Sequence, residues 1–327
     1  MDFSLNIATF NLENLDDKPG RGPTLDERIV VLRPQLIRLR ADVLCLQEVN
    51  GQEEEGQPRR LLALQELLEG TEYAGFHQVS TTTTGSGQVY DKRNIVILSR
   101  YEIEEFGQYK HDFAMAPEYR KVMAQPAEEA RKVTWERPIL HARIRVGDRR
   151  VHIINLHLKS RMPASVEGQQ LSRDSWKTAA GWAEGFFISS MKRVGQAMET
   201  RMLLDHLFDQ DEQALIAVCG DFNASSDEVP LEVIRGDVEQ TKNSDLVSRV
   251  MIACERAVAE SQRFSLYYRG KGRLLDHLLV SRQLMAWFRG AEVHNEMLND
   301  ESIGFTSDKV FSESDHAPVL ASFILPG

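Results

Sequence analysis

Short runs of β-branched and apolar residues recur along most of the chain and predict a protein rich in strands. Strands are expected at residues 5–11, 43–47, 95–98, 103–109, 139–146, 151–156, 214–219, 264–268, 274–280 and 319–324. Gly147-Asp148 fits a hairpin turn between two neighbouring strands. The pattern therefore indicates a framework made mainly of sheets.

Helical periodicity marks fewer segments. Residues 24–27 read Thr-Leu-Asp-Glu, a capping box, and they open a helix whose apolar face carries Ile29, Leu32, Leu36 and Leu39. Pro34 is expected to kink this helix or to end a first short one, because proline lacks a backbone N–H. Further helices are expected at 59–69, which Gly70 stops, and at about 191–208.

Two segments interrupt this framework, at about 108–136 and 161–190. Both mix aromatic with charged residues and show no sustained strand alternation, which is typical of rim loops or lids. Each is either a lid over a bulky substrate or an added subdomain with its own small core. The chain contains no internal repeat and no convincing linker, so residues 1–327 are expected to form a single domain.

Composition narrows the protein class. A chain of 327 residues with 42% hydrophobic residues suffices for a sizeable core, and no apolar stretch approaches the roughly 20 residues of a spanning helix. Neither an export signal nor a membrane span is expected. The three cysteines cannot all pair with one another, so free thiols and a cytoplasmic location are expected. A net charge of −10 argues against coating nucleic acid by bulk electrostatics, so metal ions or local basic patches would handle any phosphate.

Acidic and amide side chains stand where predicted strands end. Glu48 follows the strand 43–47 and is either a loop cap or a ligand. In the sequence GDFNA, Asp221 and Asn223 lie two apart, so an extended backbone aims both to the same side, where they can hold a water molecule and a phosphoryl oxygen. An Asx-type turn is the alternative explanation.

Histidines supply a second set of candidates. Asp276 lies inside an apolar strand and needs a partner, because burial of an unpaired carboxylate is costly; His316 in the sequence SDHAP would provide it. His157 and His152 point to opposite faces of one strand and cannot form a metal clip. A lone strand histidine such as His157 is more often structural, but the neighbouring Lys159 and Arg161 suit a phosphate.

Seven motifs in order resemble the endonuclease/exonuclease/phosphatase superfamily and span nearly the whole chain. They are TFNLENL (9–15), LCLQEV (44–49), RNIVILSR (93–100), NLHLKS (155–160), GDFNAS (220–225), LLDHLLVS (274–281) and SDHAPV (314–319). The resemblance implies an α/β fold, a four-layer α/β/β/α sandwich of two mixed β-sheets flanked by helices. It places the site at one end of the sandwich.

The resemblance also implies a role for each matching residue. Glu48 would be the main Mg²⁺ ligand, with Asn11 and Asp315 nearby, and Mn²⁺ should substitute, because oxygen ligands suit hard cations. Asp221 would orient or deprotonate the attacking water, Asn223 would hold a phosphoryl oxygen, and the Asp276–His316 dyad would stabilise developing charge. His157 would contact the phosphate or protonate the leaving oxygen. Further phosphate contacts are expected from Asn94, Lys159, Arg161 and Arg273.

Three functions remain open. The chain is a Mg²⁺-dependent phosphodiesterase or nuclease acting on DNA or RNA, a hydrolase of a small-molecule or lipid phosphoester, or a non-catalytic binding protein on the same fold; a monomer is expected. The intact acidic cluster argues against the third, because a scaffold has no need for like charges held together. A nuclease predicts a basic groove formed by Lys159, Arg161 and residues 269–273, whereas a small-molecule enzyme predicts a pocket roofed by the two excursions.

Overall fold

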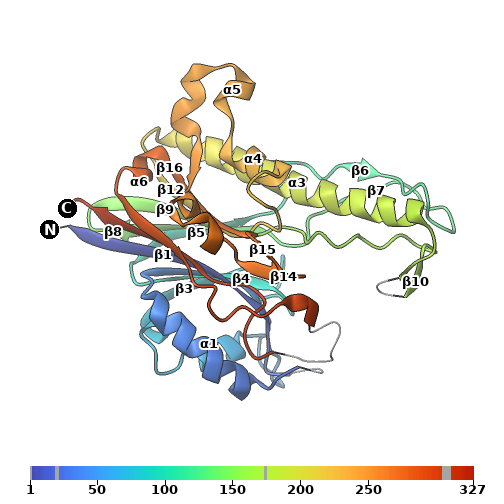
Figure 1. The fold of residues 1–327 in the computed structure, drawn as a ribbon, viewed down its shortest axis with the longest axis horizontal. Coiled ribbons are helices and arrows are strands. Elements are labelled where there is room, and N and C mark those ends of the chain that lie inside the picture. Colours follow the sequence, from blue (N-terminus) through green and yellow to red (C-terminus); the bar gives the residue numbers. More distant parts are fainter. Residues whose placement is uncertain (1, 19–21, 173–174, 304–310) are drawn as a thin grey trace.

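Two six-stranded β-sheets form the centre of the molecule, with helices on both outer sides (Figure 1). The structure is a computed structural model and describes residues 2–18, 22–172, 175–303 and 311–327. Residues 173–174 of the second predicted excursion therefore lie outside the described residues. The two chain ends lie side by side at the end of the sandwich away from β14 and β15 (Figure 1).

The first sheet contains one parallel pair of strands, β1 and β2, and its other neighbours are antiparallel. Its strands run in the order β17 (Phe288–Val293), β18 (Val319–Leu325), β1 (Phe3–Leu15), β2 (Val43–Val49), β4 (Asn94–Ser99) and β3 (His77–Ser80). Neither β3 nor β17 was expected from the sequence. Both are edge strands with few buried residues, so the apolar signal is weak there.

The second sheet repeats this arrangement around the parallel pair β9 and β12. Its strands run in the order β13 (Met251–Ala253), β16 (Asp276–Ser281), β12 (Leu215–Asp221), β9 (Arg149–His157), β8 (Ile139–Val146) and β5 (Ile103–Tyr109). The bounds of β5 and β8 are those predicted. Gly147, at φ 61°, forms the predicted hairpin turn between β8 and β9.

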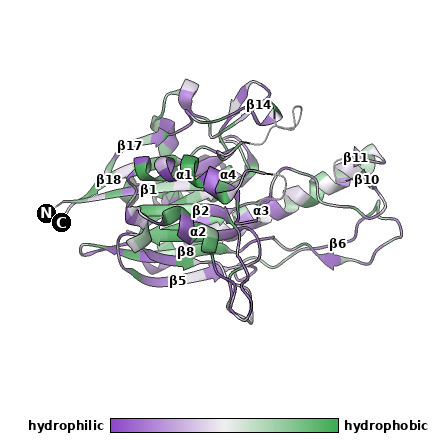
Figure 2. Ribbon diagram, turned by 90° about the horizontal axis from the view of Figure 1, so that it is seen from below, coloured by the Kyte–Doolittle hydropathy of each residue, from purple (hydrophilic) through white to green (hydrophobic). Residues whose placement is uncertain are grey.

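Three apolar clusters separate four layers. One lies between the sheets, a second lies between the first sheet and the helices α1 (Leu25–Leu39) and α2 (Leu62–Leu68), and a third packs the second sheet against α3 (Ala179–Gln210) and α4 (Val229–Arg235). Figure 2 shows the resulting hydrophobic centre of the sandwich. This arrangement confirms the predicted α/β/β/α fold.

The helix α1 begins as predicted and ends later than its proline suggested. Thr24 accepts a hydrogen bond from the Glu27 N–H, and Glu27 accepts one from the Thr24 N–H, so the capping box is confirmed. Pro34 does not end the helix. It leaves the carbonyl of Val30 without its helical partner, and Val30 is exposed, so water can solvate that carbonyl.

Shorter elements complete the chain. They are the 3₁₀ turns η1 (Glu72–Gly75), η2 (Ser244–Arg249), η3 (Cys254–Ala257) and η4 (Glu260–Gln262), the helices α5 (Val238–Thr241) and α6 (Arg282–Met285), and the hairpins β6 (Glu118–Tyr119) with β7 (Arg131–Lys132), β10 (Gln170–Ser172) with β11 (Ser175–Trp176), and β14 (Leu266–Tyr268) with β15 (Lys271–Arg273). Within the described ranges, no helix combines the length and the apolar character that crossing a bilayer requires.

The two predicted excursions meet on α3, which begins at Ala179 and not near Met191 as expected. We call the described parts of residues 108–136 and 158–178, together with residues 179–193 of α3, the arm. It extends beyond the sheets in both views (Figures 1 and 2) and has a small apolar core of Ala124, Val133, Val166 and Ile188.

Buried glutamates of α3 anchor the arm. Glu184 accepts hydrogen bonds from the Tyr119 hydroxyl and from the backbone N–H groups of Val122 and Met123. Glu199 does the same for the N–H groups of Asp112 and Phe113 and for the Trp135 indole. Because each carboxylate accepts hydrogen bonds from three donors, both can be buried. Their presence on the buried face makes the sequence of α3 look poorly amphipathic.

A buried histidine pair on the second sheet predicts how stability depends on pH. His141 and His152 share one hydrogen bond of 2.9 Å, and burial lowers the pKa of His141 to about 3 and that of His152 to about 4. Both are neutral when folded, whereas the unfolded chain takes up protons below about pH 6.5. Stability should therefore fall as pH drops from about 6.5 to 4, by at most about 1.4 kcal/mol per pH unit for each histidine.

Urea unfolding at several pH values measures this effect. His152→Gln should flatten the dependence relative to wild type, and His77→Asn, at an exposed histidine of β3, should leave it unchanged. Parallel curves for wild type and His152→Gln would contradict the assignment.

Candidate active site

Four side chains meet at the carboxyl ends of the two parallel strand pairs. Asn11 ends the regular pairing of β1 with β2, and Glu48 follows its partner Gln47; His157 on β9 lies opposite Asp221 on β12. His157 Nε2 is 3.2 Å from Asp221 Oδ2 and 3.5 Å from Glu48 Oε1. Residues far apart in sequence therefore come together, because the carboxyl ends of the central strands of both sheets lie at the same end of the sandwich.

Asp221 is the centre of this group. Its Oδ2 accepts hydrogen bonds from the side-chain amides of Asn11, at 3.1 Å, and Asn223, at 3.0 Å, and faces His157. Burial alone raises the pKa of Asp221, but His316 and His157 outweigh it and hold the pKa below its usual range. Asp221 is therefore a stable carboxylate that orients donors.

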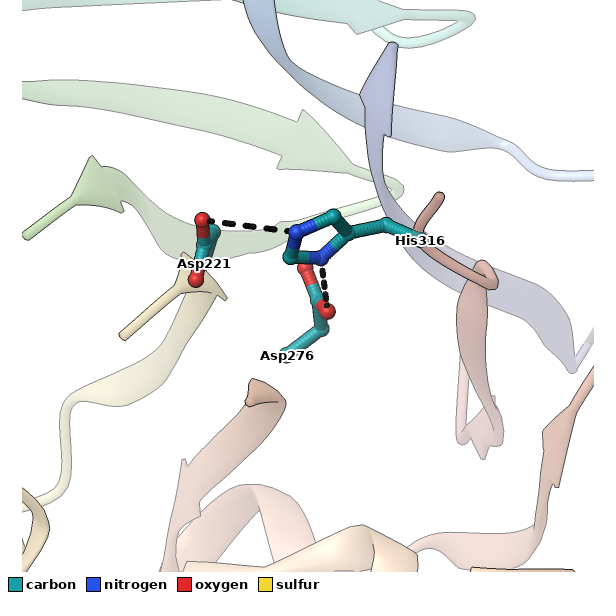
Figure 3. A group of neighbouring side chains, drawn as sticks. All are labelled: Asp221, Asp276 and His316. Atoms are coloured by element: carbon teal, nitrogen blue, oxygen red, sulfur yellow. Dashed lines mark hydrogen bonds and ion pairs between the residues drawn. The ribbon is translucent and has the colours of Figure 1, made fainter. Parts of the chain in front are cut away.

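His316 and Asp276 form the predicted dyad (Figure 3). Asp276 is fully buried on β16, and its Oδ2 is 2.6 Å from His316 Nδ1 and 2.7 Å from the Ser265 hydroxyl. Burial alone lowers the pKa of His316, but the carboxylates of Asp276, Asp315 and Asp221 outweigh it and raise it well above its usual range. The ring is thus an imidazolium whose Nε2, 4.0 Å from Asp221 Oδ2, points toward the centre of the site.

Gly220 allows the strand end that carries Asp221. Its φ is 138°, and a Cβ at this position would lie 1.9 Å from the carbonyl oxygen of Leu156 on β9. Asn223 then adopts φ 48°, and its N–H donates to Asp221 Oδ1 at 2.8 Å. Asn223 thus closes an Asx-type turn, the alternative explanation from the sequence, and the extended backbone expected through residues 221–223 is wrong, because β12 ends at Asp221. The two side chains meet in another way, since the Asn223 amide donates to Asp221 Oδ2.

A left-handed backbone recurs around the site. Glu13, Asn14, Glu48 and Arg93 all have φ between 46° and 59°. The Asn14 N–H donates to Glu48 Oε2, and Arg93 Nε lies 3.3 Å from Asn14 Oδ1 and 3.7 Å from the Glu48 carboxylate. Such conformations cost about 1–2 kcal/mol each in non-glycine residues and typically collect at functional sites.

Three carboxylates lie near one another on the first-sheet side of the site. Glu13 Oε2 accepts the N–H of Asp315, and both residues lie close enough to Glu48 to repel it. Arg28 faces all three carboxylates but donates to the carbonyls of Leu12 and Glu13, and Arg93 and His316 add positive charge nearby. Burial raises the pKa of Asp315 well above its usual range, and Asp315 Oδ1 has no hydrogen-bond partner among the described residues.

This donor set fits a hard divalent cation. The excess of carboxylate oxygens and the unpartnered Oδ1 of Asp315 are what such a cation would satisfy. By distance alone, the group of described residues whose potential ligand atoms all lie within 4.8 Å of one another is Asp221, Asp276 and His316, and not the three carboxylates. We favour Glu13, Glu48 and Asp315, because His316 Nδ1 is already bound to Asp276 and an imidazolium carries no free lone pair.

The four predicted phosphate contacts have different environments. The Asn94 amide is buried and donates to the carbonyls of Val49 and Tyr90, so it shapes the loop after β2. Lys159 donates hydrogen bonds to the Ser160 hydroxyl and the Met162 carbonyl. Arg161 donates to the Asn223 carbonyl and forms an ion pair with Glu228. Only Arg273 is exposed, on the β14–β15 hairpin, 5.6 Å from the Tyr268 ring.

Sequence reasoning missed several residues of the site. Glu13 stands in the quoted motif TFNLENL, which was its available signal. Arg137 is buried, its Nη1 donates to the His157 carbonyl, and burial lowers its pKa although the carboxylate of Glu48 opposes that shift. His277, beside Asp276, pairs with buried Glu255 and reaches the Ala224 carbonyl, so it fixes the loop after Asp221.

Comparison with known proteins gives one family. The model of a family described as "Endonuclease/Exonuclease/phosphatase family" matches residues 8–316. A comparison with curated proteins found no match. The fold is similar to an endonuclease/exonuclease/phosphatase family protein from Bacteroides thetaiotaomicron, with 14% identity, a TM-score of 0.61, and coverage of 100% of this chain and 96% of that one.

Two further solved structures share the fold. A 3'-5' exonuclease, NExo, from Neisseria meningitidis is 17% identical with a TM-score of 0.53, covering 98% of this chain and 99% of that one. Truncated TDP2 from Caenorhabditis elegans is 16% identical with a TM-score of 0.53, covering 98% of each chain. At these identities the likeness concerns the fold.

Substitution of Gly220 tests how tightly the strand pairing sets the site. Gly220→Ala should destabilise the protein by about 3 kcal/mol or more, because the new methyl group meets a backbone carbonyl that cannot move without breaking the sheet. Urea unfolding measures the change. Gly75→Ala, where no atom lies within 4 Å of the added Cβ, should change stability far less. Equal effects of the two substitutions would refute this account of Gly220.

Proposed function

Because the chain belongs to the endonuclease/exonuclease/phosphatase family of hydrolases, we propose that it is a Mg²⁺-dependent phosphodiesterase acting on nucleic acid. The observation that carries the proposal is the ring of donors around Asp221 facing the Asp276–His316 dyad. Such a constellation can orient a water molecule on one side of a phosphate and neutralise charge on the other.

Asp221 orients the attacking water in this mechanism. Its Oδ2 already accepts from Asn11 and Asn223, and its lowered pKa makes it a weak base that holds a proton only briefly. His157 is kept neutral, because burial and then Arg137 lower its pKa, and it donates Nε2–H toward Asp221. Its role is therefore to fix the carboxylate, and proton transfer to the leaving oxygen needs another donor.

His316 supplies positive charge where the phosphoryl oxygens develop negative charge. Asp276 holds the imidazolium through Nδ1, and Nε2 lies 4.0 Å from both Asp221 and Asp315, beyond hydrogen-bond distance. An oxygen of the substrate placed between them would receive that hydrogen bond. The Asn223 amide, which donates to Leu158 and Asp221, borders the same space.

Glu48, Asp315 and Glu13 would hold Mg²⁺, with Asn11 beside them. When bound, the ion neutralises charge on the phosphate and polarises the P–O bond. Mn²⁺ would substitute, because it accepts the same oxygen ligands.

A nucleic-acid substrate is favoured over a small or lipid phosphoester by the β14–β15 hairpin and by the course of the arm. The arm extends beyond the sheets (Figure 1), and the hairpin places Arg269 and Arg273 5.2 and 5.6 Å from the Tyr268 ring. Aromatic and cationic groups in alternation suit bases and phosphates. Among the similar folds, NExo has been solved with a product DNA hairpin.

A substrate panel tests the activity. With Mg²⁺ or Mn²⁺, the protein should cleave bis-p-nitrophenyl phosphate and DNA or RNA in preference to p-nitrophenyl phosphate and sphingomyelin. Asp221→Asn and Glu48→Gln should each lower kcat at least about 100-fold, because each removes a charge that acts on the transition state.

Matched controls separate catalysis from folding. Asp227→Asn and Glu69→Gln make the same chemical changes at exposed positions and should retain wild-type rates. Absence of any phosphoester cleavage, or wild-type rates in Asp221→Asn and Glu48→Gln, refutes the catalytic proposal. Cleavage of sphingomyelin or small monoesters alone assigns the activity to the alternative substrate class.

Metal binding has a readout independent of turnover. After treatment with a chelator, added Mg²⁺ should raise the Tm, and at 100 times its Kd the stabilisation is about 2.7 kcal/mol. Asp315→Asn and Glu48→Gln should abolish the rise, whereas Glu69→Gln should keep it. An unchanged wild-type Tm with Mg²⁺, Mn²⁺ or Ca²⁺ would show that this carboxylate group binds no ion.

A further inference from the structure

A basic pocket lies on the arm, outside the group of residues described above. Its volume is about 350 Å³, and it opens between the β6–β7 hairpin, the segment after β9 and α3. Its floor is apolar, formed by Val133 and Ile188 of the small core of the arm. Its walls carry four cations, Lys121, Arg131, Lys132 and Lys192.

Two of the four cations of the pocket have a carboxylate partner, and two form no ion pair with the described residues. Glu128 is the one carboxylate among its lining residues and lies 3.5 Å from Lys121. Lys192 lies 3.5 Å from Glu136 at the edge, and Arg131 and Lys132 are exposed and form no ion pair with the described part of the chain. Because the whole chain has a net charge of −10, this concentration of cations points to an anionic ligand.

The pocket is close to the catalytic residues. Thr134 lines it, and at most about 11 Å of chain separates the backbone of Thr134 from that of Arg137, whose side chain donates to the carbonyl of His157. Arg193, next to Lys192, donates to the carbonyls of Lys159 and Ser160, just after His157. A molecule that extends from the site along the arm therefore reaches the pocket.

Aromatic side chains lie at the pocket and elsewhere on the same stretch of α3. Tyr119 lines the pocket and contacts the Phe187 ring edge-on at 5.4 Å. Trp182 and Phe186 stack on each other at 5.8 Å nearer the start of the helix, and all three α3 aromatics are 42–49% exposed. Exposed rings and cations on one arm form a pattern that binds unpaired nucleic-acid strands, because any base can stack on an aromatic face.

We propose that this pocket binds a non-scissile backbone phosphate of a nucleic-acid strand, with neighbouring bases stacked on Trp182, Phe186 or Phe187. The inference rests on the proposed phosphodiesterase function and adds a second point of attachment to it. The strand must be single there, because stacking on the helix requires unpaired bases.

The test uses the full chain with Arg131→Glu and Lys132→Glu combined. In an Asp221→Asn background, binding of a labelled single-stranded DNA of about 12 nucleotides, followed by fluorescence anisotropy, should weaken at least 10-fold. The slope of log affinity against log salt should lose about 1.4, which corresponds to two phosphate contacts on a single strand. Arg282→Glu with Arg289→Glu makes the same charge change at exposed residues of α6 and β17 and should have little effect.

Kinetics distinguishes this subsite from the reaction itself. With Asp221 intact, the Arg131→Glu/Lys132→Glu variant should lose kcat/KM on the oligonucleotide at least 10-fold and keep wild-type rates on bis-p-nitrophenyl phosphate, which is too small to reach the pocket. The combined variant Trp182→Ala/Phe186→Ala should weaken the binding of single-stranded DNA more than the binding of a blunt duplex of equal length.

Each outcome bears on one claim. If the pocket variant cleaves both bis-p-nitrophenyl phosphate and the oligonucleotide with wild-type kinetics, the subsite is refuted. The proposed function is then unaffected. If the pocket variant instead lost activity on anionic lipid vesicles and kept it on the oligonucleotide, the proposed nucleic-acid subsite would also be refuted. If no phosphoester is cleaved, the proposed function fails, and the anisotropy result still decides whether the pocket holds a strand.

Discussion

A buried set of hydrogen bonds between the two sheets sets the geometry of the site. Asn155 on β9 donates to the carbonyls of Leu46 and Val96 in the opposite sheet, and Gln47 on β2 donates to Asn155 Oδ1 at 2.7 Å. All of these groups are out of contact with water, so a shift of one sheet against the other would leave costly unpaired polar groups. Because Glu48 follows Gln47 and His157 lies two residues beyond Asn155, this clamp holds the two halves of the site at contact distance.

The site accumulates negative charge that the fold only partly offsets. Asp221 is surrounded by donors from Asn11, Asn223 and His157, and His316 adds positive charge, so Asp221 is a stable carboxylate in a buried place. Asp276 Oδ2 is hydrogen-bonded to His316 and Ser265, but burial raises the pKa of Asp276, and its Oδ1 has no hydrogen-bond partner among the described residues. Glu13 and Asp315 face Arg28, which donates to backbone carbonyls instead. The donors around Asp221 therefore suit the orientation of water, and the less compensated carboxylates suit charge neutralisation by an ion in phosphoester hydrolysis.

Prediction from sequence succeeded where a short stretch of sequence has a clear pattern or where a buried charge needs a partner. The bounds of β5 and β8, the capping box of α1 and the pairing of Asp276 with His316 all follow from patterns within a few residues or from the cost of a lone buried carboxylate. The exposed edge strands β3 and β17 carry no such pattern. Arg137 was missed for another reason: its contact with the His157 carbonyl crosses the fold, and no local spacing reveals it. Glu13 stands in a quoted motif, but its contact with Asp315 joins residues far apart in sequence.

The long helix α3 shows how a sequence that looks poorly amphipathic can be the part that joins the arm to the site. Its buried residues include Glu184, Arg193, Gln196 and Glu199, which would normally argue against a core-facing helix. Each one binds backbone of another segment: Glu184 and Glu199 hold the first excursion, and Arg193 and Gln196 hold the carbonyls of Lys159, Ser160 and Arg137. A polar face that pairs with loop backbone fixes loops more specifically than an apolar face, because each bond has a direction. The first excursion and the segment after His157 are therefore attached to the same helix, and a ligand bound by the arm is placed at a defined position relative to β9.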